Sequence, residues 1–253
     1  MHFVEFVHAL ERSIGISVRG AAPLSWDEDH ITYNMLDGVR QTISGRQIDG
    51  LHRPCSIAAQ VHKLRGNPET KYGDVAVLVR LSSWDGDVLE GVGFLEGKKR
   101  ALHTGDFSAF SLRQAKRINR NAPHAQLLMY DAADITGFTD NIAVLLPLPW
   151  AYSLMSMVPK TNAICTPIGT AVEARNCSPS LYKYGVPLSI QLAWRFFRGF
   201  DLHFAQSALG AVRQFAQATV GGVSFLLVVG VAFGEGMEPS LPEFSRDAYQ
   251  SLG

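Results

Sequence analysis

GDVAVLV at residues 73–79 and GFLEGKK at residues 93–99 are the two strands of a predicted β-hairpin that turns near residues 85–86. Residues 75–79 and 92–95 are nearly continuous apolar runs, as expected of strands that are covered on both faces. The sequence therefore predicts that this hairpin lies inside an α/β sheet.

Three charged residues lie at one end of the hairpin. Glu96 and Lys98 share a face of their strand, because strand side chains alternate, and folding the hairpin brings Asp74 next to them. A two-residue turn would place Asp74 opposite Gly97, on the wrong face for Glu96, so the pairing requires an odd-length loop or a bulge. Two carboxylates beside an ammonium group suit a hard divalent cation held next to a phosphate.

This arrangement resembles the core of the PD-(D/E)XK nuclease superfamily, which has the restriction-endonuclease-like fold. The resemblance implies that Asp74 and Glu96 are ligands of Mg²⁺ or Mn²⁺, and that Lys98 orients or helps to deprotonate the attacking water. The proline of the family motif is absent, because Tyr72-Gly73 precedes Asp74. The alternative interpretation is that Glu96 and Lys98 are a solvated pair on an exposed strand, and that Asp74 belongs to a turn.

Helical periodicity follows the hairpin over residues 106–119, with Asp106 or Ser108 as the candidate N-cap. Gln114 lies on the apolar stripe of this helix, where an unpaired amide would be costly. The resemblance implies that Gln114 is directed towards the active site. A glutamine at the edge of the stripe, bonded to backbone, is the alternative.

Basic residues around this helix form a predicted footprint for the phosphate backbone of DNA. The set is Lys99, Arg100, Arg113, Lys116, Arg117 and Arg120, and its last four members share one helix face. A solvated helix face is the alternative interpretation.

Upstream, residues 25–39 have the pattern of an amphipathic helix. Ser25 and Glu28 fit a capping box, which would explain both residues without catalysis. Glu28 also lies on the apolar stripe, and the resemblance implies a glutamate at this place that points to the metal. Glu28 is therefore a candidate third carboxylate, with Asp29 behind it.

Composition bounds the remaining possibilities. The chain has 253 residues with 23 basic and 23 acidic residues, so DNA binding would depend on the local basic patch. With 47% hydrophobic and only 18% charged residues, it is expected to form a homo-oligomer or to bind a partner subunit. The three cysteines lack CxxC spacing, which favours a reducing cytoplasm, and the grouping of His52, Cys55 and His62 matches no common zinc module.

Two apolar segments, residues 141–159 and 214–234, are interrupted by proline or glycine and polar residues. We therefore expect core segments and no membrane span. The N-terminus has no signal-peptide pattern, and the chain lacks a complete phosphate-binding loop, so no nucleotide cofactor is expected.

Together these observations predict a single α/β domain over residues 1–253. Its αβββαβ core would cover about residues 20–131, and residues 132–253 would be a C-terminal α/β extension of the same sheet, closed by a strand at 223–229. The function expected from the resemblance is a Mg²⁺-dependent DNA endonuclease. A nuclease without an evident sequence-reading motif needs control of its activity, and a role as the effector subunit of a restriction or anti-phage defence system would supply that control. The alternative is a catalytically silent nuclease-fold subunit that serves as a binding scaffold.

Overall fold

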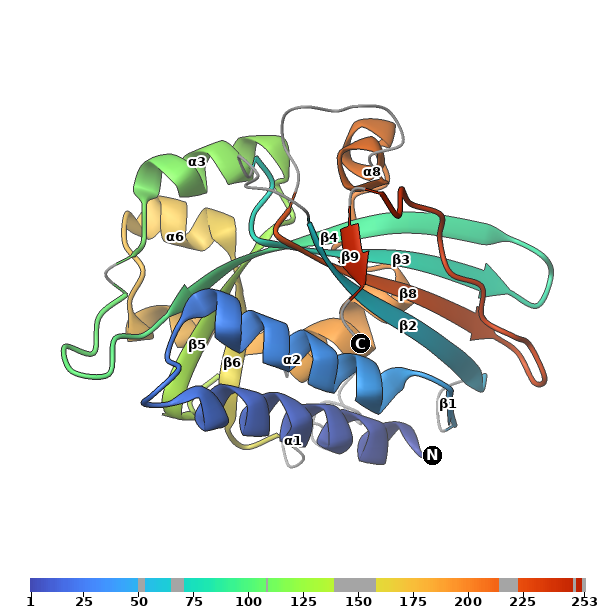
Figure 1. The fold of residues 1–253 in the computed structure, drawn as a ribbon, viewed down its shortest axis with the longest axis horizontal. Coiled ribbons are helices and arrows are strands. Elements are labelled where there is room, and N and C mark those ends of the chain that lie inside the picture. The colour runs from blue at the N-terminus through green and yellow to red at the C-terminus, as the bar shows by residue number, and fades with distance from the viewer. Residues whose placement is uncertain are drawn as a thin grey trace.

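The computed structural model describes residues 1–49, 53–64, 71–107, 109–138, 158–213, 223–247 and 249–251. These residues form a mixed α/β fold around a nine-stranded sheet (Figure 1). The helices are α1 (Phe3–Ala21), α2 (Glu28–Ile43), α3 (Leu112–Asn121), α6 (Ile168–Ala174), α7 (Leu188–Ile190) and α8 (Gln206–Arg213), with short η1 (Pro179–Tyr184), η2 (Gln191–Arg195) and η3 (Phe196–Arg198). The strands are β1 (Arg46–Ile48), β2 (Cys55–Leu64), β3 (Val75–Ser83), β4 (Val88–Lys99), β5 (Gln126–Ile135), β6 (Thr161–Pro167), β7 (Val186–Pro187), β8 (Phe225–Phe233) and β9 (Tyr249–Ser251).

The sheet has the order β1-β2-β8-β3-β4-β5-β6-β7, and β9 pairs with β2. Strands β3 and β4 are the predicted antiparallel hairpin, and β5 runs parallel to β4 after the α3 crossover. The predicted closing strand at residues 223–229 corresponds to β8, which joins the same sheet but does not extend it at an edge. It lies inside the sheet, between β2 and β3, and burial of nearly all its residues fits this central position.

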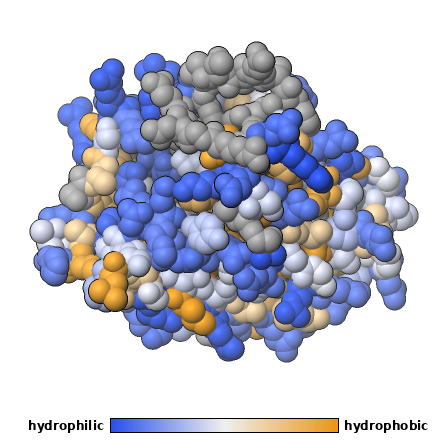
Figure 2. All heavy atoms as spheres, viewed as in Figure 1, coloured by the Kyte–Doolittle hydropathy of each residue, from blue (hydrophilic) through white to orange (hydrophobic). Residues whose placement is uncertain are grey.

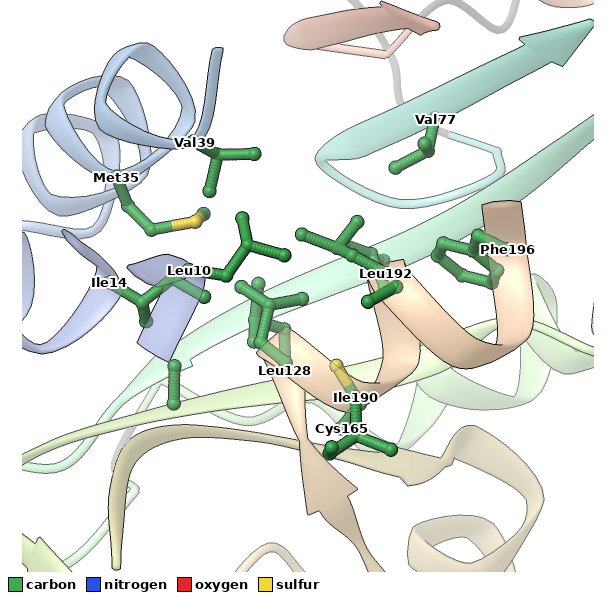
Figure 3. Packing of buried hydrophobic residues seen from close by; sticks show 14 of the residues in the cluster. Leu10, Ile14, Met35, Val39, Val77, Leu128, Cys165, Ile190, Leu192 and Phe196 are labelled. Atoms are coloured by element: carbon green, nitrogen blue, oxygen red, sulfur yellow. The ribbon is translucent and has the colours of Figure 1, made fainter. Parts of the chain in front are cut away.

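Two helical layers cover the two faces of the sheet (Figure 1). Helices α1 and α2 pack on one face, where Leu10, Met35 and Val77 belong to one large buried cluster with residues of β5, β6 and η2 (Figure 3). Helices α3 and α8 cover the other face, over a second cluster that contains Phe94 and Ile118. The hairpin is therefore buried on both sides, as its apolar runs predict.

The loop of the hairpin has an odd number of residues. Ser83 N–H donates to Asp87 O at 2.9 Å and Gly86 N–H donates to Ser83 O at 3.0 Å, so residues 84–86 form a three-residue loop. Gly86 has a φ of +90°, a left-handed conformation that glycine adopts without strain. This loop gives the register that a site between Asp74 and Glu96 requires.

Two predicted helix starts are wrong. Helix α2 begins after Asp27, whose side chain accepts from the N–H groups of Asp29 and His30, so Ser25 is not the cap. Asp27 has the same capping chemistry as Ser25 and lies next to the first helical residue. Helix α3 begins at Leu112 after Ser111, whose hydroxyl caps Gln114 N–H, so the helix starts later than Asp106 or residue 108, the latter lying outside the described residues.

Most of the first apolar segment and the start of the second lie outside the residues that the structure describes. Residues 141–157 and 214–222 lie outside the described residues, whereas β8 is a buried strand as predicted. None of the helices in the described ranges is long and apolar enough to cross a bilayer. Viewed as in Figure 1, hydrophobic residues appear as small separate areas among hydrophilic ones (Figure 2).

A candidate metal and phosphodiester site at the end of the hairpin

The candidate site lies where β4 continues beyond the start of β3. The pairing of Val75 with Leu95 places Asp74 opposite Glu96 one residue further on. Gly73 allows this close approach, because its φ is +115° and an added Cβ would lie 2.7 Å from Leu95 O. The glycine before Asp74 therefore brings the carboxylate against β4.

Two carboxylates take the place of the missing strand beside β4. Leu95 O accepts from Asp74 N–H, so the backbone groups of Gly97 and Lys99, two and four residues on, face the same open side. Asp74 Oδ2 accepts from Gly97 N–H at 2.9 Å, and Glu28 Oε1 accepts from Lys99 N–H at 3.2 Å. These hydrogen bonds satisfy the edge of β4 and fix both carboxylates at one end of the strand.

The Lys98 ammonium group lies among three carboxylates. Its Nζ is 2.8 Å from Glu96 Oε1, 3.6 Å from Glu28 Oε2 and 4.0 Å from Asp74 Oδ2. It also donates to Gly97 O at 2.6 Å. Three acidic groups against one basic group give the cluster an excess of negative charge when all are ionised, and only 7% of the Lys98 side chain is exposed.

Glu96 is the buried member of this cluster. Its side chain is 2% exposed, and within the described ranges the Lys98 ammonium group beside Oε1 is the polar partner of its carboxylate, while Oε2 has none. Burial, followed by the charge of Asp74, raises the pKa of Glu96 to about 8. A buried carboxylate with an oxygen that lacks a partner is costly, so the Glu96 environment favours a proton or a further cation besides Lys98.

The pKa values of Asp74 and Lys98 are also shifted. Burial raises the pKa of Asp74, although Lys98 and the hydrogen bond from Gly97 oppose this change. Burial disfavours the charged form of Lys98, but the attraction of Glu96, Asp74 and Glu28 outweighs it and raises the Lys98 pKa above its ordinary value. Lys98 is therefore a cation at neutral pH.

The donor set fits a site of the kind that Mg²⁺ uses. This ion is commonly held by one or two carboxylates, with waters and substrate phosphate completing its shell. Asp74 and Glu96 supply two carboxylates, and Glu96 Oε2, which has no partner within the described ranges, provides free acceptor capacity. Within the described ranges, no group of three or more His, Cys, Asp or Glu side chains is close enough to enclose a metal by itself.

Two residues beneath the site were not predicted from the sequence. Thr32 Oγ1 and Tyr130 OH are hydrogen bonded at 3.0 Å, and a Cβ on Gly97 would lie within 4 Å of atoms of both side chains and of Asp74. Thr32 follows Glu28 by one helical turn, so its spacing could have indicated the site. Tyr130 depends on the β4–β5 register, which a single sequence does not reveal.

Of the remaining predicted residues, Lys99, Arg100 and Asp29 lie outside α3, and the others lie on α3. Lys99 donates its Nζ hydrogen to Trp26 O, and Arg100 binds Gly105 O at 2.7 Å and Asp131 at 2.8 Å, so both side chains hold local structure. Asp29 lies 3.5 Å from Lys63 on the surface, in an ion pair separate from the Lys98 cluster.

The members on α3 face a different environment. Arg113, Lys116, Arg117 and Arg120 are exposed. Gln114 is half-buried, and among the described residues no hydrogen bond joins its side chain to the Lys98 cluster. Because α3 covers the face opposite α2, Gln114 and Glu28 belong to different layers.

Comparisons of the chain with models of known protein families, with curated proteins and with solved structures gave no match.

Proposed function

We propose that this chain is a Mg²⁺- or Mn²⁺-dependent DNA endonuclease with a restriction-endonuclease-like core. The observation that carries the proposal is the convergence of Asp74, Glu96 and Glu28 on Lys98 at one end of a buried hairpin. The chain order α2, β1, β2, β3, β4, α3, β5 supports this proposal, because it contains the αβββαβ order of that core with the short strand β1 added; in the sheet, β8 lies between β2 and β3.

In this proposal Asp74 and Glu96 hold the cation, which when bound supplies charge stabilisation to the phosphate and lowers the pKa of a water. Lys98 acts as a fixed hydrogen-bond donor, because three carboxylates keep it protonated. It would orient the attacking water or a phosphate oxygen, and it would not serve as a general base in this state. Catalysis would then be largely electrostatic, with groups that need little rearrangement during the reaction.

Glu28 has a separate role in this scheme. One of its oxygens accepts from Lys99 N–H, and the other lies 3.6 Å from Lys98 Nζ. Glu28 therefore positions Lys98 and adds negative charge to the site. The exposed basic residues of α3 would bind phosphates of the DNA substrate. The protein would act in the cytoplasm, as a homo-oligomer or with a partner subunit, and its role would be that of an effector in a restriction or anti-phage defence system.

A catalytically silent scaffold is the second candidate. The 2.8 Å contact between Lys98 and Glu96 favours it, because the ion pair offsets the carboxylate charge without a metal. An assay of supercoiled plasmid with Mg²⁺, with Mn²⁺ and with EDTA separates the two candidates. The nuclease predicts nicking or linearisation that requires the cation, and the scaffold predicts intact plasmid under all three conditions.

A further inference from the structure

The outer part of β4 has a free edge. Strand β5 pairs with β4 only over Leu95–Lys99, and the hairpin extends beyond it (Figure 1). His203 adds one further pair, with backbone hydrogen bonds of 3.0 and 2.8 Å to Val92. The chain then continues into α8. Within the described ranges, the outer stretch Val88–Glu90 therefore has no strand on this side.

The backbone groups on this edge belong to Val88 and Glu90. In an antiparallel pair, alternate residues direct their N–H and C=O groups to opposite sides of the strand. Val92 bonds to His203 on the free side, so the residues two and four positions before it face the same way. Among the described residues, no backbone hydrogen bond joins the N–H and C=O groups of Val88 and Glu90 to another segment.

This edge lacks the features that commonly prevent strand pairing. Exposed edges of natural sheets often carry lysine, proline or a bulge. Residues 88–91 contain neither lysine nor proline, and their register with β3 is regular. Val88 and Leu89 are apolar, yet they are 51% and 47% exposed. The edge is therefore suited to a further strand.

A groove with a volume of about 470 Å³ runs along this edge. Its lining is Arg80, Val88, Leu89, Glu90, Phe204, Gln206, Leu209 and Arg213. Val88 and Leu89 point to opposite faces of the sheet, so a lining that includes both reaches the edge of β4. Residues of the segment 204–209 bound the groove as well. A single extended chain can enter such a slot, whereas β4 of a second copy is accompanied by its own segment 204–209.

Apolar side chains lie on one face beside the groove. The Phe204 ring packs over Gly91, where an added Cβ would lie 2.8 Å from it. Leu89 is two residues before Gly91 and shares this face of β4. Phe204 is 43% exposed, so both side chains have surface available to an apolar residue of a ligand.

Positive charge is in excess on the other face. Arg80 Nη1 lies 3.2 Å from Glu90 Oε1, and Arg213 contacts the other oxygen of Glu90. Two guanidinium groups share one carboxylate, so one positive charge remains without a counter-charge among the residues that line the groove. An acidic residue of a ligand would complement this charge.

We propose that the groove binds an extended peptide, which adds to the edge of β4 as an antiparallel strand. The peptide continues the line of His203, whose pairing with Val92 is antiparallel. Its residues opposite Val88 and Glu90 exchange backbone hydrogen bonds with β4 and point to the arginine face. The residue between them points to Leu89. The peptide that fits best therefore alternates acidic and apolar residues.

Fluorescence anisotropy tests the proposal in EDTA. The probe is a fluorescein-labelled hexapeptide of alternating glutamate and valine, blocked at both ends, and wild-type protein should bind it with a Kd of about 0.1 mM or tighter. Lysine in place of glutamate should weaken binding about tenfold, because the charge is reversed. N-methylation of the glutamates removes the N–H groups that face β4 and should weaken binding at least about tenfold. N-methylation of the valines, whose N–H groups face away, should weaken it about threefold at most.

Variants of the edge locate the binding surface. Val88→Pro removes a donor that β3 does not use and should weaken binding at least about tenfold. Val88→Thr keeps this donor and a β-branched side chain, so its affinity should lie within about twofold of wild type. Leu89→Asp should weaken binding about tenfold, because it replaces the apolar contact with a charge. Leu24→Asp makes the same change at a 97% exposed position outside the groove and should leave affinity unchanged.

No cation or cleavage is involved, so failure of this proposal is distinguishable from failure of the nuclease proposal. Absence of saturable peptide binding by wild-type protein would overturn it. Equal affinity of the glutamate-methylated peptide, or of folded Val88→Pro, would also overturn it. Sedimentation velocity identifies the other occupant. A wild-type dimer that dissociates in Leu89→Asp and does not bind the peptide would assign the edge to a second copy of the chain.

Discussion

The two ends of the β3–β4 hairpin carry charge clusters of opposite sign. The inner end, formed by Asp74, Glu96 and Lys98 with Glu28 from α2, has three acidic groups and one basic group. The outer end, formed by Arg80, Glu90 and Arg213, has two basic groups and one acidic group. One strand register aligns both clusters, yet the inner end has an excess of negative charge and the outer end an excess of positive charge.

Burial explains much of this difference. At the inner end Glu96 is 2% exposed and its pKa is raised to about 8 although Lys98 lies beside it, so a proton or a further cation is favoured there. At the outer end Arg80 and Glu90 are 29% and 19% exposed and form an ordinary partly solvated ion pair. The lesson is that similar pairs on one hairpin differ in chemistry according to how much water reaches them.

The largest expected effect is loss of cleavage at the inner end. Asp74→Asn, Glu96→Gln and Lys98→Ala should each reduce Mg²⁺-dependent plasmid cleavage about a thousandfold or more, because each removes a fixed charge from the reacting phosphate or its cation. Glu173→Gln, the same chemical change at an exposed position of α6, should cleave as wild type does. Full activity of Glu96→Gln would disprove the site assignment, provided that circular dichroism shows the variants to be folded.

The next effect concerns stability and pH. Because the pKa of Glu96 is raised in the folded protein, its contribution is fully present below its unfolded pKa of about 4.3 and is lost as pH rises through 8. In EDTA, the free energy of unfolding of wild-type protein should fall between pH 5 and pH 9. In Glu96→Gln this fall should be smaller by roughly 2–4 kcal/mol, because glutamine does not titrate. Urea unfolding at the two pH values measures this difference. Equal pH dependence in the two proteins would show that Glu96 titrates normally.

Glu28 gives a smaller expected effect that separates catalysis from structure. Glu28→Gln can still accept from Lys99 N–H, and the cap of α2 is Asp27, so thermal stability should change little. Loss of its charge near Lys98 should lower the cleavage rate about tenfold. Steady-state cleavage rates check this, and unchanged kinetics would assign Glu28 to structure alone.

The smallest expected effect belongs to the basic face of α3. Lys116→Glu with Arg120→Glu should weaken binding of unrelated duplexes similarly, and each lost phosphate contact should reduce the slope of log affinity against log salt by about 0.9. Reversal of Arg12 and Lys183, which are exposed elsewhere, is the matched control. Fluorescence anisotropy measures both quantities. An unaltered slope in the α3 variant would mean that Lys116 and Arg120 do not contact DNA phosphates and that DNA binds to another surface.

The sequence predicted the hairpin because its signals are local. Apolar runs marked both strands, and the requirement for an odd loop followed from the alternation of side chains, as the three-residue loop confirms. Helix α1 was not predicted, although Phe3, Phe6 and Leu10 have helical spacing and are all buried. The start of α2 was misplaced because Ser25 and Asp27 both have capping side chains, and packing decides between them.

Other parts of the site depend on contacts that no single segment encodes. The position of β8 between β2 and β3 comes from pairing across much of the chain, and it could not be inferred from an apolar run alone. The partners of Lys99 and Arg100 likewise come from distant residues, so exposed basic residues could not be told from structural ones. The contact between Thr32 and Tyr130 depends on the docking of α2 against β5.

Titration calorimetry of Mn²⁺ into wild-type protein, Glu96→Gln and Arg80→Gln tests the contrast between the two ends most directly. If the inner end holds a cation, wild-type protein should bind Mn²⁺ saturably. The Mn²⁺ affinity should be at least about tenfold lower in Glu96→Gln and unchanged in Arg80→Gln. Equal Mn²⁺ affinity in wild type and Glu96→Gln, or absence of binding by wild-type protein, would contradict a cation site at the inner end of the hairpin.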